Sequence, residues 1–309
     1  MGGIPIIICH EGRQPYLQEC INQAKKFDNT VILVGDESNK DMGADHWYSM
    51  AELETDEWHD FTELFCNMST NPEKFELQCF KRFFLIYALM KKDIIHECIH
   101  IDSDVLCYFD FSMFKEFAGR YMVSLGIPRK QDRYRWSAGA MTSYWTKEGI
   151  SSFCDFVIST YKNNMALLAE KWDYQKKNNL PGGICDMTLL YLWSRQYDGT
   201  KILNTIEQFE IGQNKVVIDN NINSIESGSG DKYVYDKLFN VKKIIFIDGV
   251  PYLQKSDGTR IRTLVLHFQG GAKRYMKFYA GACKHGKPLY YFLAAAIKCK
   301  RLLFNFRKR

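Results

Sequence analysis

The sequence predicts an α/β fold, in which helices flank a sheet, followed by a β-hairpin-rich part and a basic C-terminal tail. Two observations support this prediction. Within the first 36 residues a helical pattern separates two apolar, β-branched runs, and beyond residue 240 short strand patterns alternate with Asp-Gly turns. The 309 residues, 46% hydrophobic and 25% charged, are enough for one large globular domain or two small ones.

The first third of the chain alternates strands with helices. Residues 4–9 form a continuous apolar run, typical of a strand buried on both faces of a parallel sheet. Pro15 fits the first turn of a helix, and residues 30–34 predict a second buried strand. Such a strand–helix–strand unit places ligand-binding groups at the carboxyl ends of its strands. Residues 46–70 predict short helices, and the Asn-Pro-Glu at 71–73 predicts the start of a long buried helix.

The later parts of the chain differ in the elements that they predict. A strand is expected over 94–101 and helical segments over 111–200. Residues 244–247, 251–254 and 260–268 predict consecutive β-hairpins with Asp-Gly turns. We therefore expect one domain over 1–283, with a β-rich part at 205–268 and a separate tail at 284–309.

Charge is distributed unevenly along the chain. The net charge is +5, but residues 1–257 carry 28 basic and 36 acidic side chains, a net of −8. The acidic body argues against a nucleic-acid partner. The tail at 284–309 has eight Lys or Arg, no acid and several aromatic residues, which favours binding to the inner membrane surface. The alternative is a C-terminal helix packed on the domain with a solvated basic face.

Cysteine usage and the N-terminal residues predict a cytoplasmic protein, peripheral on the inner face of the cytoplasmic membrane. None of the ten cysteines forms a CxxC pair, so reduced thiols are expected. No apolar run approaches the length of a membrane-spanning helix, and the first apolar run has no basic region before it, so no signal peptide is expected.

The first group that could carry chemistry is an acidic pair at the end of a strand. Asp102 and Asp104 follow an apolar run with one residue between them, which places both carboxylates on one side of the chain. Two close carboxylates repel unless a cation lies between them, and Mn²⁺ or Mg²⁺ prefers oxygen ligands. The alternative is a solvated acidic turn, because such pairs are common in loops.

The second group is a His-x-x-Gly-x-x-Lys pattern directly after a strand. His267 could ligate a metal, Gly270 allows close approach of the backbone to a phosphate, and Lys273 supplies positive charge. A lone buried histidine with satisfied hydrogen bonds is the alternative.

Two further charged residues lie in apolar or glycine-rich surroundings. Arg82 shares a helix face with apolar side chains, so it needs an anionic partner. That partner is either a nearby carboxylate of structural importance, or the acidic pair or a nucleotide phosphate. Asp186 follows two glycines at the start of a helix, where it is either the N-cap or a carboxylate that faces a sugar.

Some enzyme classes are not supported. The sequence has no GxxxxGK[ST], no strand-associated GxGxxG and no GxSxG. A phosphohydrolase of the HAD type also uses Asp-x-Asp at a strand end, but there the motif lies on the first strand and a Thr follows two residues later. Here the motif lies about 100 residues from the start, and Leu106 stands in the position of that Thr.

Taken together, these elements resemble the GT-A nucleotide-diphospho-sugar transferases, with a Rossmann-like mixed sheet, and are most similar to glycosyltransferase family 8. The sequence FKRFF at 80–84, about twenty residues before the IHIDSD at 99–104, is similar to that family's arginine-bearing helix and DxD strand. The SAGAM at 137–141, Asp186 and the pattern from His267 to Lys273 match its later motifs. Met187 stands where that family usually has Gln.

The resemblance implies a site for a nucleotide diphosphate sugar. Asp102, Asp104 and His267 would hold Mn²⁺ or Mg²⁺ between the two phosphates, and Lys273 would stabilise the departing diphosphate. His10 and Asp36 would line the base and ribose by their positions at strand ends. Family 8 enzymes retain anomeric configuration; if this chain inverts, Asp186 is the best general-base candidate.

The function expected from this resemblance is transfer of a hexose, from a UDP-sugar, to a surface-glycan or lipid-linked acceptor in bacterial lipopolysaccharide or capsule assembly. The competing hypothesis is a non-catalytic, membrane-associated partner protein with the same fold. The acidic pair, His267 and Lys273 favour the enzyme, because a scaffold has no need for a metal site.

Overall fold

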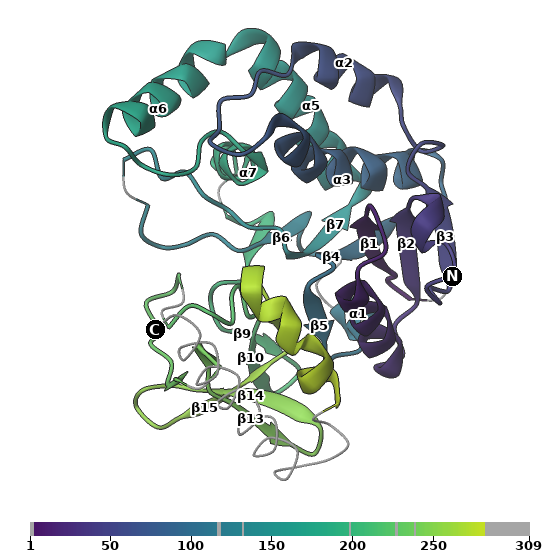
Figure 1. Ribbon diagram of the computed structural model, residues 1–309, viewed down its shortest axis with the longest axis vertical. Coiled ribbons are helices and arrows are strands. Elements are labelled where there is room, and N and C mark those ends of the chain that lie inside the picture. Colours follow the sequence, from purple (N-terminus) through teal and green to yellow (C-terminus); the bar gives the residue numbers. More distant parts are fainter. Residues whose placement is uncertain are drawn as a thin grey trace, which may run out of the picture.

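The computed structural model describes residues 3–115, 119–131, 133–197, 199–225, 228–237 and 239–281. A seven-stranded sheet runs through the middle of the molecule (Figure 1). Its strands, in spatial order, are β3 (His46–Ser49), β2 (Val31–Gly35), β1 (Ile6–His10), β4 (Glu97–Ile101), β7 (Thr142–Thr146), β6 (Val123–Leu125) and β8 (Ile202–Asn204). The first four are parallel and β7 is antiparallel to both of its neighbours, so the sheet is mixed.

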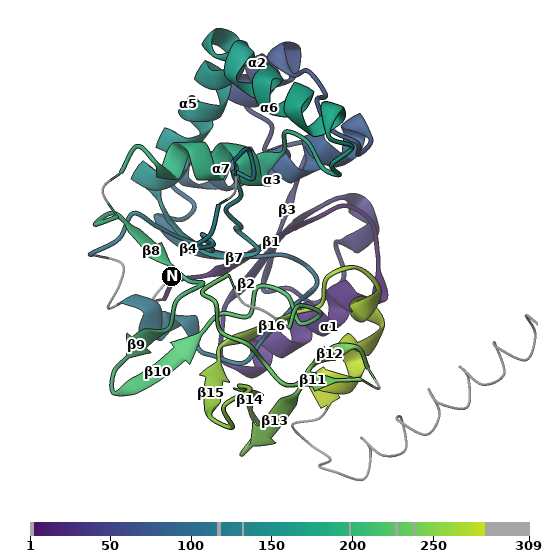
Figure 2. The ribbon, with the colours of Figure 1, turned by 90° about the vertical axis from the view of Figure 1, so that its left-hand side faces the viewer.

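Helices cover one face of this sheet, as the two views agree (Figures 1 and 2). This helical layer consists of α2 (Asp56–Leu64), α3 (Glu73–Lys91), α5 (Lys147–Asn163), α6 (Met165–Lys177) and α7 (Asp186–Ser194). On the other face lie α1 (Pro15–Lys26) and the β-rich part of the chain.

Alternation along the strands explains why both faces are covered. On β1, Ile6 and Ile8 belong to the apolar cluster around α1, whereas Ile7 belongs to the cluster under the helical layer. Successive side chains of a strand point to opposite faces, so a wholly apolar strand must be buried on both. The predicted α/β fold with a mixed sheet between helices is therefore confirmed.

The β-rich part forms a second sheet of five strands and two smaller pairs. The five strands, in order, are β13 (Ile244–Ile247), β14 (Val250–Gln254), β15 (Arg260–Thr263), β10 (Asn214–Val217) and β9 (Phe209–Ile211). The pairs are β11 (Tyr235–Asp236) with β12 (Val241–Lys242), and β5 (Val105–Cys107) with β16 (Val265–His267). The 3-10 helices within the described ranges are η1 (Glu37–Asn39), η2 (Phe111–Phe114) and η3 (Gly270–Tyr275).

Two expectations about single elements are wrong. Residues 46–49 form the parallel edge strand β3 rather than a helix, because they pair with β2; only 56–64 of that stretch is helical. Residues 260–268 are not one strand. The chain leaves the five-stranded sheet at Leu264, and β16 pairs with β5 instead, which brings His267 beside Asp104.

The helical segments expected over 111–200 are interrupted by two strands, because residues 123–125 and 142–146 pair within the central sheet as β6 and β7. Two other expectations hold within the described ranges. The hairpin between β13 and β14 turns at Asp248 and Gly249, which both have positive φ, and all eight described cysteines are free thiols. No helix among the described residues has the length and apolarity needed to cross a bilayer. The boundary at 283 and the tail at 284–309 lie outside the described residues and stay predictions.

Candidate functional site

The candidate site lies where the order of the central strands reverses. β1 has β2 on one side and β4 on the other, all parallel, and the chain visits β2 before it returns to β4. In open α/β sheets a crevice forms outside the carboxyl ends of strands at such a point. The residues at or just after these ends are His10, Asp36 and Asp102.

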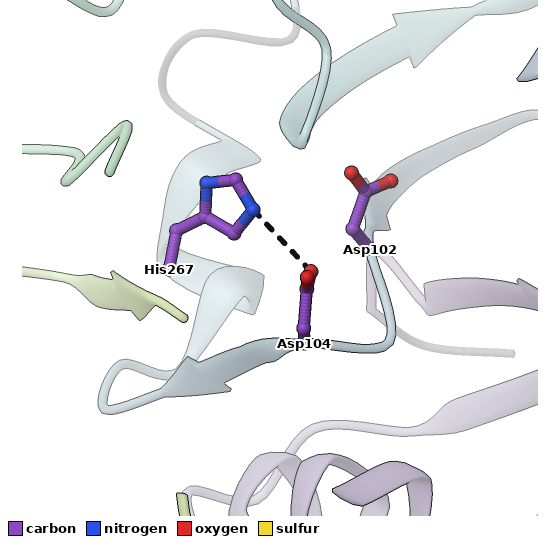
Figure 3. A group of neighbouring side chains, drawn as sticks. All are labelled: Asp102, Asp104 and His267. Carbon is purple, nitrogen blue, oxygen red and sulfur yellow. Dashed lines mark ion pairs between the residues drawn. The ribbon is translucent and has the colours of Figure 1, made fainter. Parts of the chain in front are cut away.

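A tight turn and a strand pair bring the second carboxylate and the imidazole to the same place. The Val105 amide donates to the Asp102 carbonyl at 3.0 Å, so the chain turns back at once into β5. His267 pairs with Val105 across β5 and β16, and the Phe268 amide donates to the Asp104 carbonyl at 2.8 Å. One ligand atom from each of Asp102, Asp104 and His267 lies within 4.8 Å of the others, and Figure 3 shows the three side chains converging.

Charge within this cluster is balanced by two basic groups on Asp104. Its Oδ1 lies 3.3 Å from His267 Nε2, and its Oδ2 lies 3.2 Å from Lys273 Nζ. Burial would raise the pKa of Asp104, but the hydrogen bond and charge of His267, with Lys273, lower it below its usual value. Burial opposes protonation of His267 as well, yet Asp104 raises the pKa of that imidazole to about 9.

The backbone around residue 220 fixes the orientation of the imidazole. His267 Nδ1 donates to the Asn220 carbonyl, and the His267 amide donates to Asp219 Oδ2 at 3.2 Å. Asp219 also forms an ion pair with Lys242, and both side chains are buried. Because Nδ1 is occupied, Nε2 is the nitrogen that faces the two aspartates.

Arg82 of α3 joins Asp102 to Asp186. Its guanidinium donates to Asp102 Oδ1 through one nitrogen and to Asp186 Oδ2 through the other. Burial would lower the pKa of Arg82, but the two carboxylates hold it above its usual range. The sequence left open which partner this arginine has; the structure gives it one aspartate of the acidic pair and one further carboxylate.

Asp186 is not the N-cap of its helix, which corrects one of the two interpretations left open. Cys185 is the cap of α7, and Asp186 is the first helical residue, turned toward Arg82. Burial raises the pKa of Asp186, and the charge of Arg82 offsets this only in part. The N-cap and the first helical position are adjacent in sequence, so the residue pattern could not decide which of these two positions Asp186 occupies.

His100 is a site neighbour that the sequence interpretation missed. Its Nε2 lies 3.7 Å from Asp102 Oδ1, and its Nδ1 donates to the Ala140 carbonyl at 2.9 Å. Burial, followed by the charge of Arg82, lowers the pKa of His100 to about 4, so the ring is neutral. The available signal was its place two residues before Asp102 on the same buried strand.

The remaining predicted residues surround this cluster. His10 Nε2 donates a hydrogen bond to Gln14 Oε1, and burial lowers the pKa of this imidazole. Asp36 accepts from the Gly12 amide at 2.6 Å and from the Ser38 amide at 2.9 Å, so its carboxylate holds the loop after β1 against the end of β2. Gly270 has φ +60, and a Cβ there would meet open space.

The donor set fits a hard or borderline divalent cation. Two carboxylates from one turn and one imidazole with a fixed Nε2 converge at the carboxyl ends of the strands, where ligands bind. The proton that His267 carries at neutral pH would leave when a cation binds, as is usual for histidine ligands.

Comparisons with known proteins give structural similarities only. No protein-family model matches the sequence, and the search of curated proteins gives no match. Mouse xyloside xylosyltransferase 1 is 12% identical with a TM-score of 0.45, over 65% of this chain and 84% of that chain. The galactosyltransferase LgtC, in complex with donor and acceptor sugar analogues, is 12% identical with a TM-score of 0.43, over 93% of this chain and 99% of that chain.

A third solved structure is a glycosyltransferase involved in glycosylation of the major capsid of PBCV-1, 11% identical with a TM-score of 0.35, over 65% of this chain and 83% of that chain. Identities of 11–12% with TM-scores below 0.5 carry no functional argument.

Proposed function

We propose that this chain is a metal-dependent glycosyltransferase that moves a hexose from a nucleotide diphosphate sugar, a UDP-sugar, to a glycan or lipid-linked acceptor. The observation that carries the proposal is the convergence of Asp102, Asp104 and His267 at the carboxyl edge of the sheet, beside Lys273. A cluster of this composition, at the point where the order of the strands reverses, suits a cation that binds a diphosphate.

The three converging residues would hold Mn²⁺ or Mg²⁺. When bound, the cation would supply positive charge to the diphosphate oxygens, where negative charge develops as the sugar departs. Lys273 would complete this role. Its side chain is 34% exposed and now bonds to Asp104, so it is free to turn toward a phosphate once that carboxylate has another cation to bind.

Arg82 is better suited to positioning than to binding phosphate. Two carboxylates already neutralise its guanidinium, and its side chain is only 15% exposed. It would hold Asp102 in place and link it to Asp186. Since Asp186 is buried in this ion pair, we propose that it positions Arg82 and, through Arg82, Asp102. Retention of configuration, as in family 8, is the outcome that we propose.

The donor's nucleoside would lie along the ends of β1 and β2. We propose that His10 and Asp36 line this part of the site and that the Gly270 backbone approaches the diphosphate. The biological setting proposed is bacterial surface-polysaccharide or lipopolysaccharide assembly, on the inner face of the cytoplasmic membrane, with residues 284–309 as the membrane-binding segment.

The test is a thermal-shift panel of UDP, GDP, ADP and CMP, each with and without Mn²⁺. A ligand at 100 times its Kd stabilises the fold by about 2.7 kcal/mol, which a melting curve resolves. We expect a shift with UDP only when metal is present, and its loss in Asp104→Asn. The matched control is Asp60→Asn, an exposed carboxylate on α2, which should behave as the unmodified chain.

Each other result has a clear meaning. A shift with a different nucleoside diphosphate would support a transferase but contradict the UDP-sugar as its donor. No shift with any nucleotide would contradict the proposal and favour the non-catalytic partner protein. An equal shift in Asp104→Asn would show that the nucleotide binds without this cluster. Release of free sugar from UDP-glucose or UDP-galactose then tests turnover directly.

A further inference from the structure

A second candidate site lies beside the first turn of α7. It is a pocket of about 420 Å³, a size within the range of small-molecule sites. Its walls come from the loop at 133–137, one side of α6 and the segment at 180–188. We call it the Lys171 pocket. Cys185 and Met187, on either side of Asp186, both line it.

Positive charge dominates this pocket. Arg133, Arg135 and Lys171 line it, and none of the described residues that line it is Asp or Glu. Lys171 is only 2% exposed. Its Nζ donates to Thr188 Oγ1 at 2.6 Å and to the Arg135 carbonyl at 3.3 Å. Within the described residues no carboxylate lies within ion-pair distance of this ammonium; its other printed neighbour is the Trp136 ring, whose centroid lies 5.9 Å from Nζ.

A buried cation without a counter-charge is costly unless a ligand supplies the anion. The cost is visible here, because burial lowers the pKa of Lys171 to about 8. A second unmet group points the same way. Gln175 Oε1 is buried with no hydrogen-bond partner among the described residues, and its side chain also lines the pocket. A hydroxyl group could donate to that oxygen.

Aromatic rings form one wall. Tyr134 packs against Trp136 and Tyr174, with ring centroids 5.3 and 4.8 Å apart. Tyr134 and Trp136 both have positive φ, +62° and +36°, a conformation that non-glycine residues rarely adopt and that occurs at ligand sites. The Ala138 amide donates to the Met187 carbonyl at 3.0 Å and so ties this loop to α7.

We infer that the Lys171 pocket binds an acidic sugar unit of the acceptor, a hexose that carries a carboxylate or a phosphate. Lys171 meets the anion, Gln175 accepts from a hydroxyl, and Trp136 stacks on the apolar face of the ring. The assignment to the acceptor rests on the proposed function, because Asp186 and Arg82 connect this pocket to the proposed donor site. The binding of an acidic sugar stands on the pocket alone.

The experiment is isothermal titration of the full chain at pH 7 with glucuronic acid, glucose 6-phosphate and glucose. We expect at least one acidic sugar to bind about tenfold or more tightly than glucose, the advantage of one charge-assisted hydrogen bond. The acid that binds more tightly identifies the anion as carboxylate or phosphate. Equal affinity for glucose, or no binding of either acid, would overturn the inference.

Variants locate the binding. Lys171→Met should weaken the affinity for the acidic sugar about tenfold or more. Lys176→Met should leave that affinity unchanged, because Lys176 lies on the same helix but is exposed. Trp136→Ala should also weaken it, and this second variant decides the matter if the first fails to fold. Unchanged affinity in a folded pocket variant would overturn the inference.

The same protein titrated with UDP and Mn²⁺ separates the two proposals. If an acidic sugar binds in a way that depends on Lys171 but no nucleotide binds, the proposed transferase function is contradicted and the inference about the pocket stands. If the nucleotide binds but neither acidic sugar does, the inference about the pocket is contradicted and the proposed transferase function stands.

Discussion

The ion pair between Asp219 and Lys242 offers a sharp test of how the fold positions His267. Both side chains are at most 3% exposed. Asp219 uses its other oxygen to accept from the His267 amide at 3.2 Å. Asp219→Asn keeps the shape and an acceptor oxygen but removes the charge, so the Lys242 ammonium stays buried and unpaired. Removal of one partner from a buried pair costs about 3–5 kcal/mol.

The double variant gives the pair's interaction energy. Asp219→Asn with Lys242→Met removes both charges, and such replacements are often neutral. We therefore expect the double variant to lose less free energy of unfolding than the two single variants lose in sum, by about 3 kcal/mol or more. The assay is urea denaturation of all four proteins at pH 7. If the effects of the single variants simply add, the reasoning is refuted.

A more exposed pair in the same part of the chain is the control. Lys255 Nζ lies 3.0 Å from Asp231 Oδ1, with the side chains 15% and 27% exposed. Asp231→Asn should cost no more than about 1 kcal/mol. Asp219→Asn should also weaken Mn²⁺ binding by about 10–100-fold, because Asp219 positions a proposed ligand, and Asp231→Asn should leave it unchanged.

Three further predictions concern buried charges and close packing. Below pH 8, Lys171→Met should stabilise the ligand-free protein, because burial of the ammonium costs up to about 3 kcal/mol of folding free energy. The hydrogen bonds of Lys171 that the variant loses make the net gain smaller than this. Because the folded pKa is the lower one, that advantage should shrink as pH rises from 8 toward 10.5, in melting curves at each pH. Gly183→Ala should cost about 1–3 kcal/mol in urea denaturation, because a Cβ would overlap neighbouring backbone, whereas Gly119→Ala, with open space, should be nearly neutral. Arg82→Met should cost about 3 kcal/mol or more by the same measurement, and adding Asp186→Asn should recover part of it; no recovery would show that the two charges are not coupled.

Local patterns were sufficient for the elements that depend on the chain's immediate neighbours. Wholly apolar runs at 4–9 and 30–34 predicted strands buried on both faces, and Pro15 marks the start of α1 as expected. The acidic pair and the His-x-x-Gly-x-x-Lys pattern were found because each directly follows a strand. Failures occurred where tertiary pairing decided the structure. Residues 46–49 became a strand because the edge of β2 was available to them.

The sequence by itself determined the alternation of strands and helices, and it identified the charged residues at the strand ends. These depend on side-chain periodicity and on turn residues close in the chain. Only the tertiary structure decided that β16 leaves the five-stranded sheet to pair with β5, which places His267 beside Asp104. It also brought Arg82 between two aspartates, and formed a pocket around Lys171 from three segments between residues 133 and 188. Contacts between residues more than 100 positions apart depend on how whole elements pack, and no local pattern records that packing.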